Sequence, residues 1–339
     1  MPTADPSSSW SQRIAAGTAA YEQGRYAEAE PAFTAALAEA EGFGAQDVRL
    51  ALSANNLAEL YRAQGRYKDA EPLFERALLI RQSVQGPEHP QAVASLNNLG
   101  ALYLAQGRHE EAERIFGQAL AIRERTLGPD HPDVAVSLNN LGEVHRTRGQ
   151  YAEAEARFRR ALAIWEKAQG REHSNVALAS NNLAAVARAQ GRSAEAEPLL
   201  RRALAIWETA LGPDHPSVAL TLINLGDLHR VEGRHAEAEA ECRRALSILE
   251  RRLGADHPDV AAALNNLALV HRDRGEYPAA ESLLKRAVAI YDGPSTDRPR
   301  DHPRHAQALE NLAKVYRAQG KAAEADDAQS RAAIIWLRR

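Results

Sequence analysis

Apolar residues recur every three or four positions along almost the whole chain, which is the period of an amphipathic α-helix. The segment 131–149, HPDVAVSLNNLGEVHRTRG, has a proline where a helix can start and stops at a glycine. The segment 150–170, QYAEAEARFRRALAIWEKAQG, has the same rhythm and also stops at a glycine. No segment alternates apolar and polar residues as a strand would. The pattern therefore predicts an all-α protein built from paired helices.

The two-helix pattern repeats with a fixed period. The motif GPEHP at 86–90 returns as GPDHP at 128–132, GREHS at 170–174, GPDHP at 212–216 and GADHP at 254–258, so each glycine follows the last by 42 residues. A fixed period of this size is typical of a solenoid in which each unit packs on the next. The register predicts eight helix pairs, at approximately 12–43, 47–86, 89–128, 131–170, 173–212, 215–254, 257–293 and 302–339. We expect a disordered tail at 1–11 and an inserted loop at 292–303.

Rows of small residues predict how the paired helices pack. The first helix of every unit has Gly or Ala at one position, as at Gly100, and the second helix has Ala at two positions seven apart, as at Ala112 and Ala119. Side chains this small let helix axes come close, and leucines fill the space beside them. Cys242 occupies the position that holds Phe158 in another unit, so we expect it to fill space in the core rather than to act as a nucleophile.

This arrangement resembles the tetratricopeptide repeat. The resemblance rests on the small residue and paired alanines, on the glycine between the helices, and on a tyrosine two residues after it, at Tyr26, Tyr67, Tyr151 and Tyr277. The long period and the run NNLA…YRAQGRY are similar to the variant found in kinesin light chains and many bacterial proteins. The resemblance covers residues 12–339 and implies a single right-handed superhelical solenoid of about eight antiparallel helix pairs, from a bacterial source. The chain begins with about ten polar residues rather than the heptad coiled coil of kinesin light chains, so we do not expect a motor subunit.

Composition narrows the class of partner. The 339 residues are 45% apolar and 26% charged, with a formal net charge of −3, which is typical of a folded protein. Interspersed acids and bases give no reason to expect nucleic acid or an anionic membrane as a partner. A single cysteine excludes an intramolecular disulfide, and no apolar run is long enough for a membrane span. We expect a cytoplasmic protein without a cofactor or a bound metal.

The motif GPDHP places an acid beside a histidine in every repeat. Equivalent atoms of stacked units lie about 10 Å apart, whereas metal ligands converge at about 2 Å on one ion. No nucleophile accompanies the pair, as hydrolytic chemistry would need. We therefore interpret the motif as a helix boundary, in which glycine ends one helix while the acid and proline favour the next. The same interpretation covers His89, His131, His173, His215, His257 and His302. At a separate, inward position, His145, His229 and His271 replace tyrosine, and we interpret them as packing residues.

Two polar rows lie on one face of the first helices, away from the leucine and small-residue stripe. The first row is Asn56, Asn98, Asn140, Asn182, Asn224, Asn266 and Asn311. The second row, six residues further on, is Arg62, Arg146, Arg188, Arg230, Arg272 and Arg317. Because tetratricopeptide solenoids turn this face toward their concave groove, the resemblance implies that both rows line the groove.

The rows admit two interpretations. Asparagine inside a helix costs roughly a few tenths of a kcal/mol relative to alanine, so its recurrence indicates hydrogen bonding, either to the neighbouring helix or to the backbone of a bound peptide. Matching asparagines hold peptides in some members of the family. Arg62, Arg146 and Arg230 each follow an acid by three residues, which indicates pairing within the helix. Arg188 has no such acid, so we expect the C-terminal half of the groove to accept a carboxylate. The lysine pattern of the chaperone-binding branch is missing, which counts against that partner.

These features predict a non-catalytic scaffold that binds an extended acidic peptide in the groove. The alternative is an assembly module that self-associates weakly through the C-terminal segment 333–339, with Trp336, or docks a separate effector. Docking would use an outer basic stripe of Arg159, Arg160, Arg201, Arg202, Arg243 and Arg244. We expect no catalytic residue, because tetratricopeptide enzymes carry catalysis in an added domain and the repeats leave no room for one.

Overall fold

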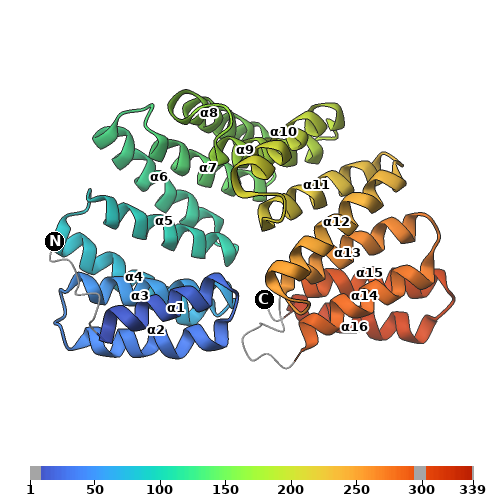
Figure 1. Ribbon diagram of the computed structural model, residues 1–339, viewed down its shortest axis with the longest axis horizontal. Helices are drawn as coiled ribbons and strands as arrows, with labels where there is room; N and C mark the ends of the chain where they lie inside the picture. Colours follow the sequence, from blue (N-terminus) through green and yellow to red (C-terminus); the bar gives the residue numbers. More distant parts are fainter. Residues whose placement is uncertain (1–8, 294–302, 338–339) are drawn as a thin grey trace. The chain divides into compact units, whose positions relative to one another are not determined.

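The computed structural model describes residues 9–293 and 303–337. Within these ranges sixteen α-helices follow one another, joined by short turns, and no strand is present (Figure 1). The predicted all-α fold with eight helix pairs is therefore confirmed. Most of the predicted tail, most of the predicted inserted loop with His302, and the last two residues lie outside the described ranges.

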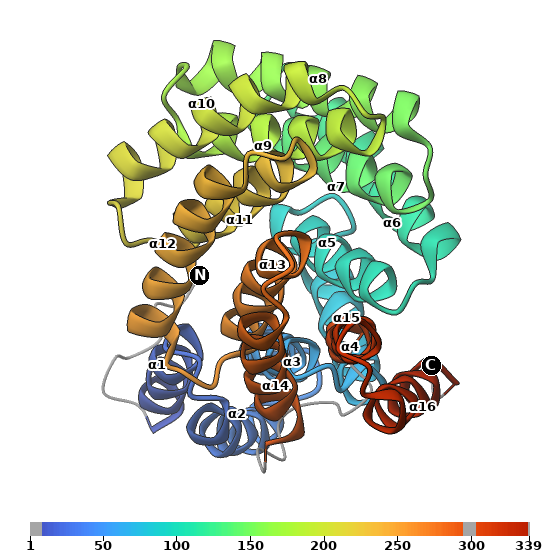
Figure 2. The ribbon, with the colours of Figure 1, turned by 90° about the vertical axis from the view of Figure 1, so that its right-hand side faces the viewer.

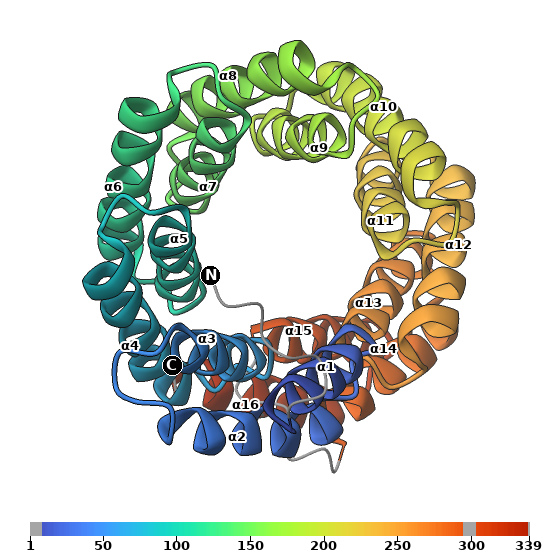
Figure 3. The same cartoon turned by 60° about the vertical axis from the view of Figure 1, so that its left-hand side comes forward.

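The chain divides into two compact units, of which unit 1 spans Met1–Gln169. Within this unit the odd-numbered helices form one layer and the even-numbered helices form the other, as Figure 3 shows for α5 to α8. The helices are α1 Ser9–Glu22, α2 Tyr26–Glu41, α3 Val48–Ala63, α4 Tyr67–Gln85, α5 Pro90–Ala105, α6 His109–Leu127, α7 Pro132–Thr147 and α8 Tyr151–Gln169.

Unit 2 spans Gly170–Arg339 and repeats the two-layer arrangement. Figure 2 shows its successive helix pairs, including α11 with α12 and α13 with α14. The helices are α9 Ser174–Ala189, α10 Ser193–Leu211, α11 Pro216–Val231, α12 His235–Leu253, α13 Pro258–Asp273, α14 Tyr277–Asp292, α15 Pro303–Ala318 and α16 Ala322–Leu337. None of the described helices of either unit is both long and apolar enough to cross a membrane.

The first helix starts earlier than the predicted pair at 12–43. Trp10 is only 5% exposed, its Nε1 donates a hydrogen bond to Ser53 Oγ at 2.8 Å, and its ring lies edge-on to Phe43. An aromatic side chain buried in this way holds its helix against the next pair. Residues 9–11, which we expected in the tail, are therefore helical, and the serine-rich stretch before Trp10 conceals this boundary in the sequence.

The rows of small residues pack as the sequence predicts. A Cβ atom added to Gly142 would lie 2.6 Å from Cε1 of Phe158, so only a residue without a side chain allows this approach without displacing the ring. Ala112 and Ala119 are fully buried in the facing helix row. Cys242 is fully buried, and burial raises the pKa of its thiol to about 12, so the prediction that it fills space is confirmed.

The GPDHP motif is confirmed as a helix boundary, and its histidine has a specific role there. The Nδ1 atom of His131 accepts a hydrogen bond from the backbone N–H of Asp133 at 3.2 Å, which caps the N-terminus of α7. His89, His173, His215 and His257 cap α5, α9, α11 and α13 in the same way, at 3.1 to 3.2 Å. In α3 the carboxylate of Asp47 takes this role, accepting from the N–H of Arg49 at 2.8 Å. The cap needs a neutral ring with a free lone pair on Nδ1.

Candidate functional site

The two predicted polar rows lie on the odd-numbered helices, and we call this surface the first-helix face. Asn56, Asn98, Asn140, Asn182, Asn224 and Asn266 are half-buried on it, and Asn311 is buried. The arginines differ more: the side chain of Arg230 is 17% exposed and that of Arg317 is 52% exposed. The face therefore offers half-buried amides from α3 to α13 and a well-exposed arginine in α15.

The asparagines form hydrogen bonds between successive odd helices. In unit 1, Nδ2 of Asn98 donates to Oδ1 of Asn55 at 2.8 Å, and Nδ2 of Asn140 donates to Oδ1 of Asn97 at 3.4 Å. In unit 2 the matching bonds join Asn224 to Asn181 at 3.0 Å and Asn311 to Asn265 at 2.9 Å. These four predicted asparagines thus donate to the residue that precedes their counterpart in the odd helix before. We call these bonds the asparagine ladder.

A departure in α13 shows what the ladder requires. Ile223 stands in α11 where five other odd helices carry an asparagine. Asn266, deprived of that acceptor, donates instead to the carbonyl oxygen of Ala262 in its own helix at 2.8 Å. The paired asparagines are thus needed together, and the observed bonds follow the first of the two interpretations, in which each amide joins neighbouring helices. A peptide-binding role for the row stays a prediction, because a primary amide has a second N–H and an acceptor oxygen.

The arginine row of unit 1 pairs within single helices. The guanidinium of Arg62 lies 2.7 Å from the Glu59 carboxylate, and that of Arg146 lies 2.5 Å from Glu143. These are the pairs expected from an acid three residues before each arginine. Their charges are locally balanced, so they leave little net attraction for a ligand.

The arginine row of unit 2 forms a chain of ion pairs across three helices. Arg188 of α9 pairs with Asp227 of α11. Arg230 lies 2.8 Å from Asp227 and 2.6 Å from Asp273 of α13. Asp273 also pairs with Arg272 at 2.7 Å. As expected, no acid precedes Arg188 in its own helix, but a partner lies 39 residues further along the chain, which spacing within one helix does not detect.

This chain of ion pairs has an excess of positive charge. Three guanidiniums share the two carboxylates of Asp227 and Asp273. Burial alone would raise the pKa of Asp273, but hydrogen bonds from Arg230 and Arg272 outweigh burial and hold it below its usual value. Asp273 therefore stays ionised, and the three guanidiniums outnumber the two carboxylates in this chain of ion pairs. Further along the face, Arg317 lies 3.9 Å from Asp326, and Lys314 beside it is exposed.

Apolar side chains lie on the same face, one helical turn before the asparagines. Leu178 in α9 is 36% exposed and Leu220 in α11 is 42% exposed. They precede Asn182 and Asn224 by four residues, which places each pair on one side of its helix. We did not single out these leucines in the sequence, although their recurrence after 42 residues was a visible signal.

The odd helices of unit 2 also border a small cavity. It lies between α13 and α15 and has a volume of about 120 Å³. Its lining is rich in amide and guanidinium groups: Ala261, Ala262, Asn265, Asn266, Tyr291, Arg304 and Gln307. A space of this size suits a small polar group rather than a whole peptide segment.

The features proposed for assembly are present but differ in character. In the outer basic stripe, Arg159, Arg160, Arg201, Arg243 and Arg244 lie 2.5 to 2.7 Å from carboxylates of Glu155, Glu124, Glu197, Glu239 and Glu208. Arg202 donates to the carbonyl oxygen of Arg171 at 3.3 Å. On α16, by contrast, Ile334, Trp336 and Leu337 are 48%, 42% and 86% exposed. The apolar end of α16 is thus the better candidate for a contact.

Comparison with known proteins places these helix pairs in a family. A tetratricopeptide repeat model matches residues 10–78, 49–125, 93–167, 175–240 and 218–292, and a second tetratricopeptide repeat model matches residues 305–338. A search of the curated proteins found no match.

Solved structures with similar repeats include a putative kinesin light chain with nearly identical TPR-like repeats from Podosopora anserina. It is 29% identical, the match covers 60% of this chain and 96% of that one, and the TM-score is 0.48. BtubC (BKLC) from P. vanneervenii is 20% identical over 86% of this chain and 94% of that one, with a TM-score of 0.44. A Rap protein complexed with competence and sporulation factor is 18% identical over 85% of this chain and 76% of that one, with a TM-score of 0.65. The last likeness is one of fold alone.

Proposed function

We propose a function from one premise: the chain belongs to the tetratricopeptide repeat family. Stacked helix-pair repeats present extended surfaces to other proteins, and the chain is a protein-interaction scaffold. Our proposal is that the first-helix face of unit 2 binds an extended peptide that carries acidic side chains. The peptide would contact Leu178, Leu220 and the chain of ion pairs that runs from Arg188 to Arg272.

The observation that carries the proposal is the excess of guanidinium groups over carboxylates in the chain of ion pairs on this face. Three arginines share two aspartates in the chain of ion pairs, so a carboxylate from a ligand can join it without displacing an existing charge. Guanidinium groups form bidentate hydrogen bonds to carboxylates, which gives orientation as well as attraction. The same exchange in unit 1 would have to break a balanced pair such as Arg146 with Glu143.

The distance between the two exposed leucines predicts how far apart the apolar residues of the ligand lie. Helices packed side by side lie about 8–10 Å apart, so Leu178 and Leu220 on adjoining odd helices are separated by a similar distance. A peptide in the polyproline II conformation rises about 3.1 Å per residue with three residues per turn, so it presents the same side about every 9 Å. We therefore expect an apolar residue at every third position of the ligand, with acidic residues between them.

A peptide array tests this spacing directly. Acidic peptides with apolar residues at period three should bind more tightly than peptides of the same composition at period two. Replacing Leu178 and Leu220 together with serine should weaken binding of the best peptide about tenfold or more, because two apolar contacts are lost. The matched control replaces Arg159 and Arg243 of the even helices with alanine and should leave the affinity unchanged. Equal affinity of the double serine variant and the unmodified chain would contradict the proposal.

The asparagine ladder allows a sharper test of ligand contact. Asn181→Ala and Asn224→Ala both remove the same rung, which joins α9 and α11. Only the second change removes an asparagine of the predicted peptide-binding row. If Asn224 holds a peptide backbone, Asn224→Ala weakens peptide binding more than Asn181→Ala does, while both lower the stability equally. Equal peptide affinities in the two variants would restrict the row to a structural role.

A second candidate function rests on the exposed end of α16. Ile334 and Leu337 leave large apolar surfaces uncovered, and such surfaces often mark contacts between proteins. We propose weak self-association through this helix as the alternative. Sedimentation velocity over a range of concentrations should show a dimer that is lost when both residues are replaced with serine. A monomer at every concentration excludes this alternative and leaves the groove proposal unaffected.

A further inference from the structure

One repeat of unit 2 combines a histidine and two acids that no other repeat combines, at positions that come together in space. His229 stands where three other units have Tyr61, Tyr103 and Tyr316 and two others have His145 and His271. Glu232 stands where the other units have Gln64, Gln106, Gln190 and Gln319, or Arg148 and Arg274. Glu241 stands where Leu73, Ile115, Leu199 and Leu283, or Arg157, are found. Because no other repeat combines a histidine and two acids at these positions, the fold alone does not require the combination.

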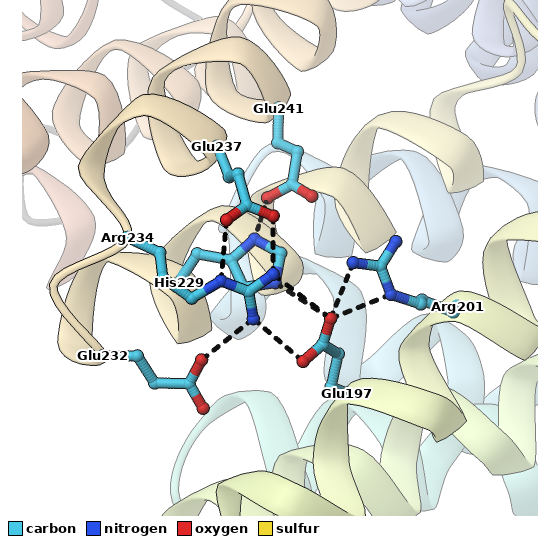
Figure 4. A network of polar contacts seen from close by, with 7 residues as sticks. All are labelled: Glu197, Arg201, His229, Glu232, Arg234, Glu237 and Glu241. Carbon is cyan, nitrogen blue, oxygen red and sulfur yellow. Dashed lines mark hydrogen bonds and ion pairs between the residues drawn. The ribbon is translucent and has the colours of Figure 1, made fainter.

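Two of these residues, Glu232 and Glu241, lie around the buried ring of the third, His229 (Figure 4). The His229 side chain is fully buried, and its Nδ1 atom lies 2.7 Å from Oε2 of Glu241 on α12. Its other nitrogen, Nε2, has no hydrogen-bond partner among the described residues and lies 3.4 Å from Oε1 of Glu197 on α10. A fully buried ring nitrogen without a hydrogen bond loses the solvation that water would give it. The Nε2 atom therefore faces the Glu197 carboxylate without a hydrogen bond to it.

The charges around the ring are unbalanced. Four carboxylates lie around the ring in Figure 4, those of Glu197, Glu232, Glu237 and Glu241. The same network contains two guanidiniums, those of Arg201 and Arg234. Both guanidiniums pair with Glu197, Arg201 at 2.6 Å and Arg234 at 2.9 Å, so the four carboxylates outnumber the two guanidiniums. The cluster can therefore accept additional positive charge.

We propose that Glu197, His229 and Glu232 form a binding site for a divalent transition-metal ion, with Zn²⁺ as the best match. One ligand atom from each residue lies within 4.8 Å of the other two. Zinc binds imidazole nitrogen and carboxylate oxygen at about 2.0–2.2 Å in a tetrahedral arrangement, which sets neighbouring ligand atoms about 3.4 Å apart. The 3.4 Å between Nε2 and Oε1 has this value, and the exposed Glu232 leaves a side open to solvent.

Glu241 supports the assignment as an orienting residue. A metal-bound histidine usually donates its other ring N–H to a carboxylate, which fixes the tautomer and the direction of the ring. The 2.7 Å contact between His229 Nδ1 and Glu241 Oε2 has this arrangement and leaves the lone pair on Nε2. Purely oxygen-binding ions such as Mg²⁺ gain nothing from a buried imidazole, so we expect them to bind poorly.

Arg234 is the competitor that a metal ion must displace. Its Nη1 atom donates to Glu197 at 2.9 Å and to Glu232 at 3.2 Å, so it bridges two of the proposed ligands. Its Nε atom also donates to Glu237 at 2.8 Å, and that bond can hold the side chain after it leaves the ligands. The proposal therefore predicts that shortening Arg234 strengthens metal binding, which a merely structural cluster would not do.

The bound ion would join two repeats. Glu197 lies on α10, whereas His229 lies on α11 and Glu232 follows α11 in the turn to α12. Coordination would connect the second helix of one repeat to the turn of the next repeat. Because the ion binds the folded arrangement, it should raise the thermal stability of the protein in proportion to its binding.

The repeats provide variants that restore residues already used elsewhere in the fold. Glu232→Gln and His229→Tyr each remove one proposed ligand and return the position to its commonest neighbour in the other units. The matched control is His271→Tyr, since His271 holds the same position one repeat later but has Arg274 where Glu232 would be. Arg234→Ala removes the competing cation.

The test is titration of the full chain with Zn²⁺ in a calorimeter, followed by thermal unfolding with Zn²⁺, with Mg²⁺ and with neither. The proposal expects one tight Zn²⁺ site, an increase in Tm with Zn²⁺ alone, and a loss of affinity of at least about tenfold in both ligand variants. It expects His271→Tyr to bind as the unmodified chain does and Arg234→Ala to bind more tightly. The proposal is overturned if the unmodified chain binds no Zn²⁺, or if His271→Tyr weakens binding as much as His229→Tyr does. Weaker binding in Arg234→Ala would also overturn it.

Discussion

Units 1 and 2 fill the same repeat positions with different side chains. In the even helices of unit 1 the inner position is aromatic, as at Phe158, which packs against a glycine of the paired helix. In unit 2 that position holds Leu200, Cys242 and Leu284. The arginine row also differs between the units. Its ion pairs stay within single helices in unit 1, whereas in unit 2 they also join different helices, as from Arg188 to Asp227.

The difference separates two ways of holding neighbouring helices together. An aromatic ring buries more apolar surface than leucine or cysteine, and each square ångström contributes roughly 25 cal/mol. Charged groups shared between helices contribute less individually, but they fix which helices are neighbours and at what register. We infer that unit 1 depends more on its aromatic core at this position, and unit 2 more on polar contacts between its odd helices.

The largest expected effect comes from the aromatic core. Phe158→Ala should lower the free energy of unfolding of unit 1 by about 3–5 kcal/mol, because it removes a large buried side chain and leaves a cavity. The counterpart Cys242→Ala should cost about 1 kcal/mol, since only one sulfur atom is removed. Hydrogen exchange followed by mass spectrometry resolves α7 and α8 from α11 and α12 and so measures each unit. Equal losses in the two variants would remove the distinction between the cores.

A smaller effect is expected from the shared acid of unit 2. Asp227→Ala deprives both Arg188 and Arg230 of a partner, and hydrogen bonds to charged groups contribute about 1.5–3 kcal/mol when they are partly buried. Since the groups are partly exposed, we expect a loss of about 1–2 kcal/mol. Glu143→Ala in unit 1 breaks a single pair within one helix and should cost less than about 0.5 kcal/mol. Urea unfolding of both variants provides the comparison, and an Asp227→Ala loss no larger than that of Glu143→Ala would contradict it.

Two individual helix caps, His215 in unit 2 and Asp47 in unit 1, should differ in their response to pH. The pKa of His215 lies below its ordinary value because burial disfavours the charged ring and Arg252 repels it. The pKa of Asp47 is also lowered, chiefly by its hydrogen bond from Arg49. The ordinary pKa is 6.5 for the histidine and 3.8 for the aspartate, and each cap is fully stabilising at a pH above that value. The stabilisation is lost as the pH falls through the lower pKa that the group has in the folded protein.

We therefore expect α11 to lose about 1 kcal/mol of local stability between pH 7.5 and pH 5, while α3 loses none. The measurement is the exchange protection of the N–H groups of Ser217 and Arg49, corrected for the intrinsic pH dependence of exchange. His215→Asp should make the first turn of α11 as insensitive to this range as that of α3. A loss of protection in α3 over the same range would show that the caps are not responsible.

Much of the fold could be predicted from the sequence because every repeat restates it. The helix boundaries, the small-residue rows and the burial of Cys242 follow from local spacing, which a period of 42 residues makes plain. The start of α1 was missed because Trp10 is held by Ser53, a contact between residues 43 positions apart. Local patterns do not contain such a contact.

The candidate site was predictable in its residues but not in its partners. Both polar rows are where the spacing places them, yet the acceptor for Asn224 and the acid for Arg188 come from other helices. The cluster at His229 was missed for the same reason. Its acids are spread from Glu197 to Glu241, and each looks ordinary until the departures from the repeat pattern are compared position by position.

The smallest effect should come from completing the asparagine ladder. Ile223→Asn supplies the acceptor that α11 lacks, so Asn266 can turn from the carbonyl of Ala262 to the neighbouring helix. A hydrogen bond of this kind contributes about 0.5–1.5 kcal/mol. Part of this gain is offset because the apolar contacts of the partly exposed Ile223 side chain are lost. We expect a net gain of about 0.5 kcal/mol in unit 2. The reverse change in unit 1, Asn55→Ile, removes the acceptor of Asn98 and should cost about as much. Urea unfolding measures both, and a gain in the second variant would mean that isoleucine packing, rather than the ladder, sets the preference at this position.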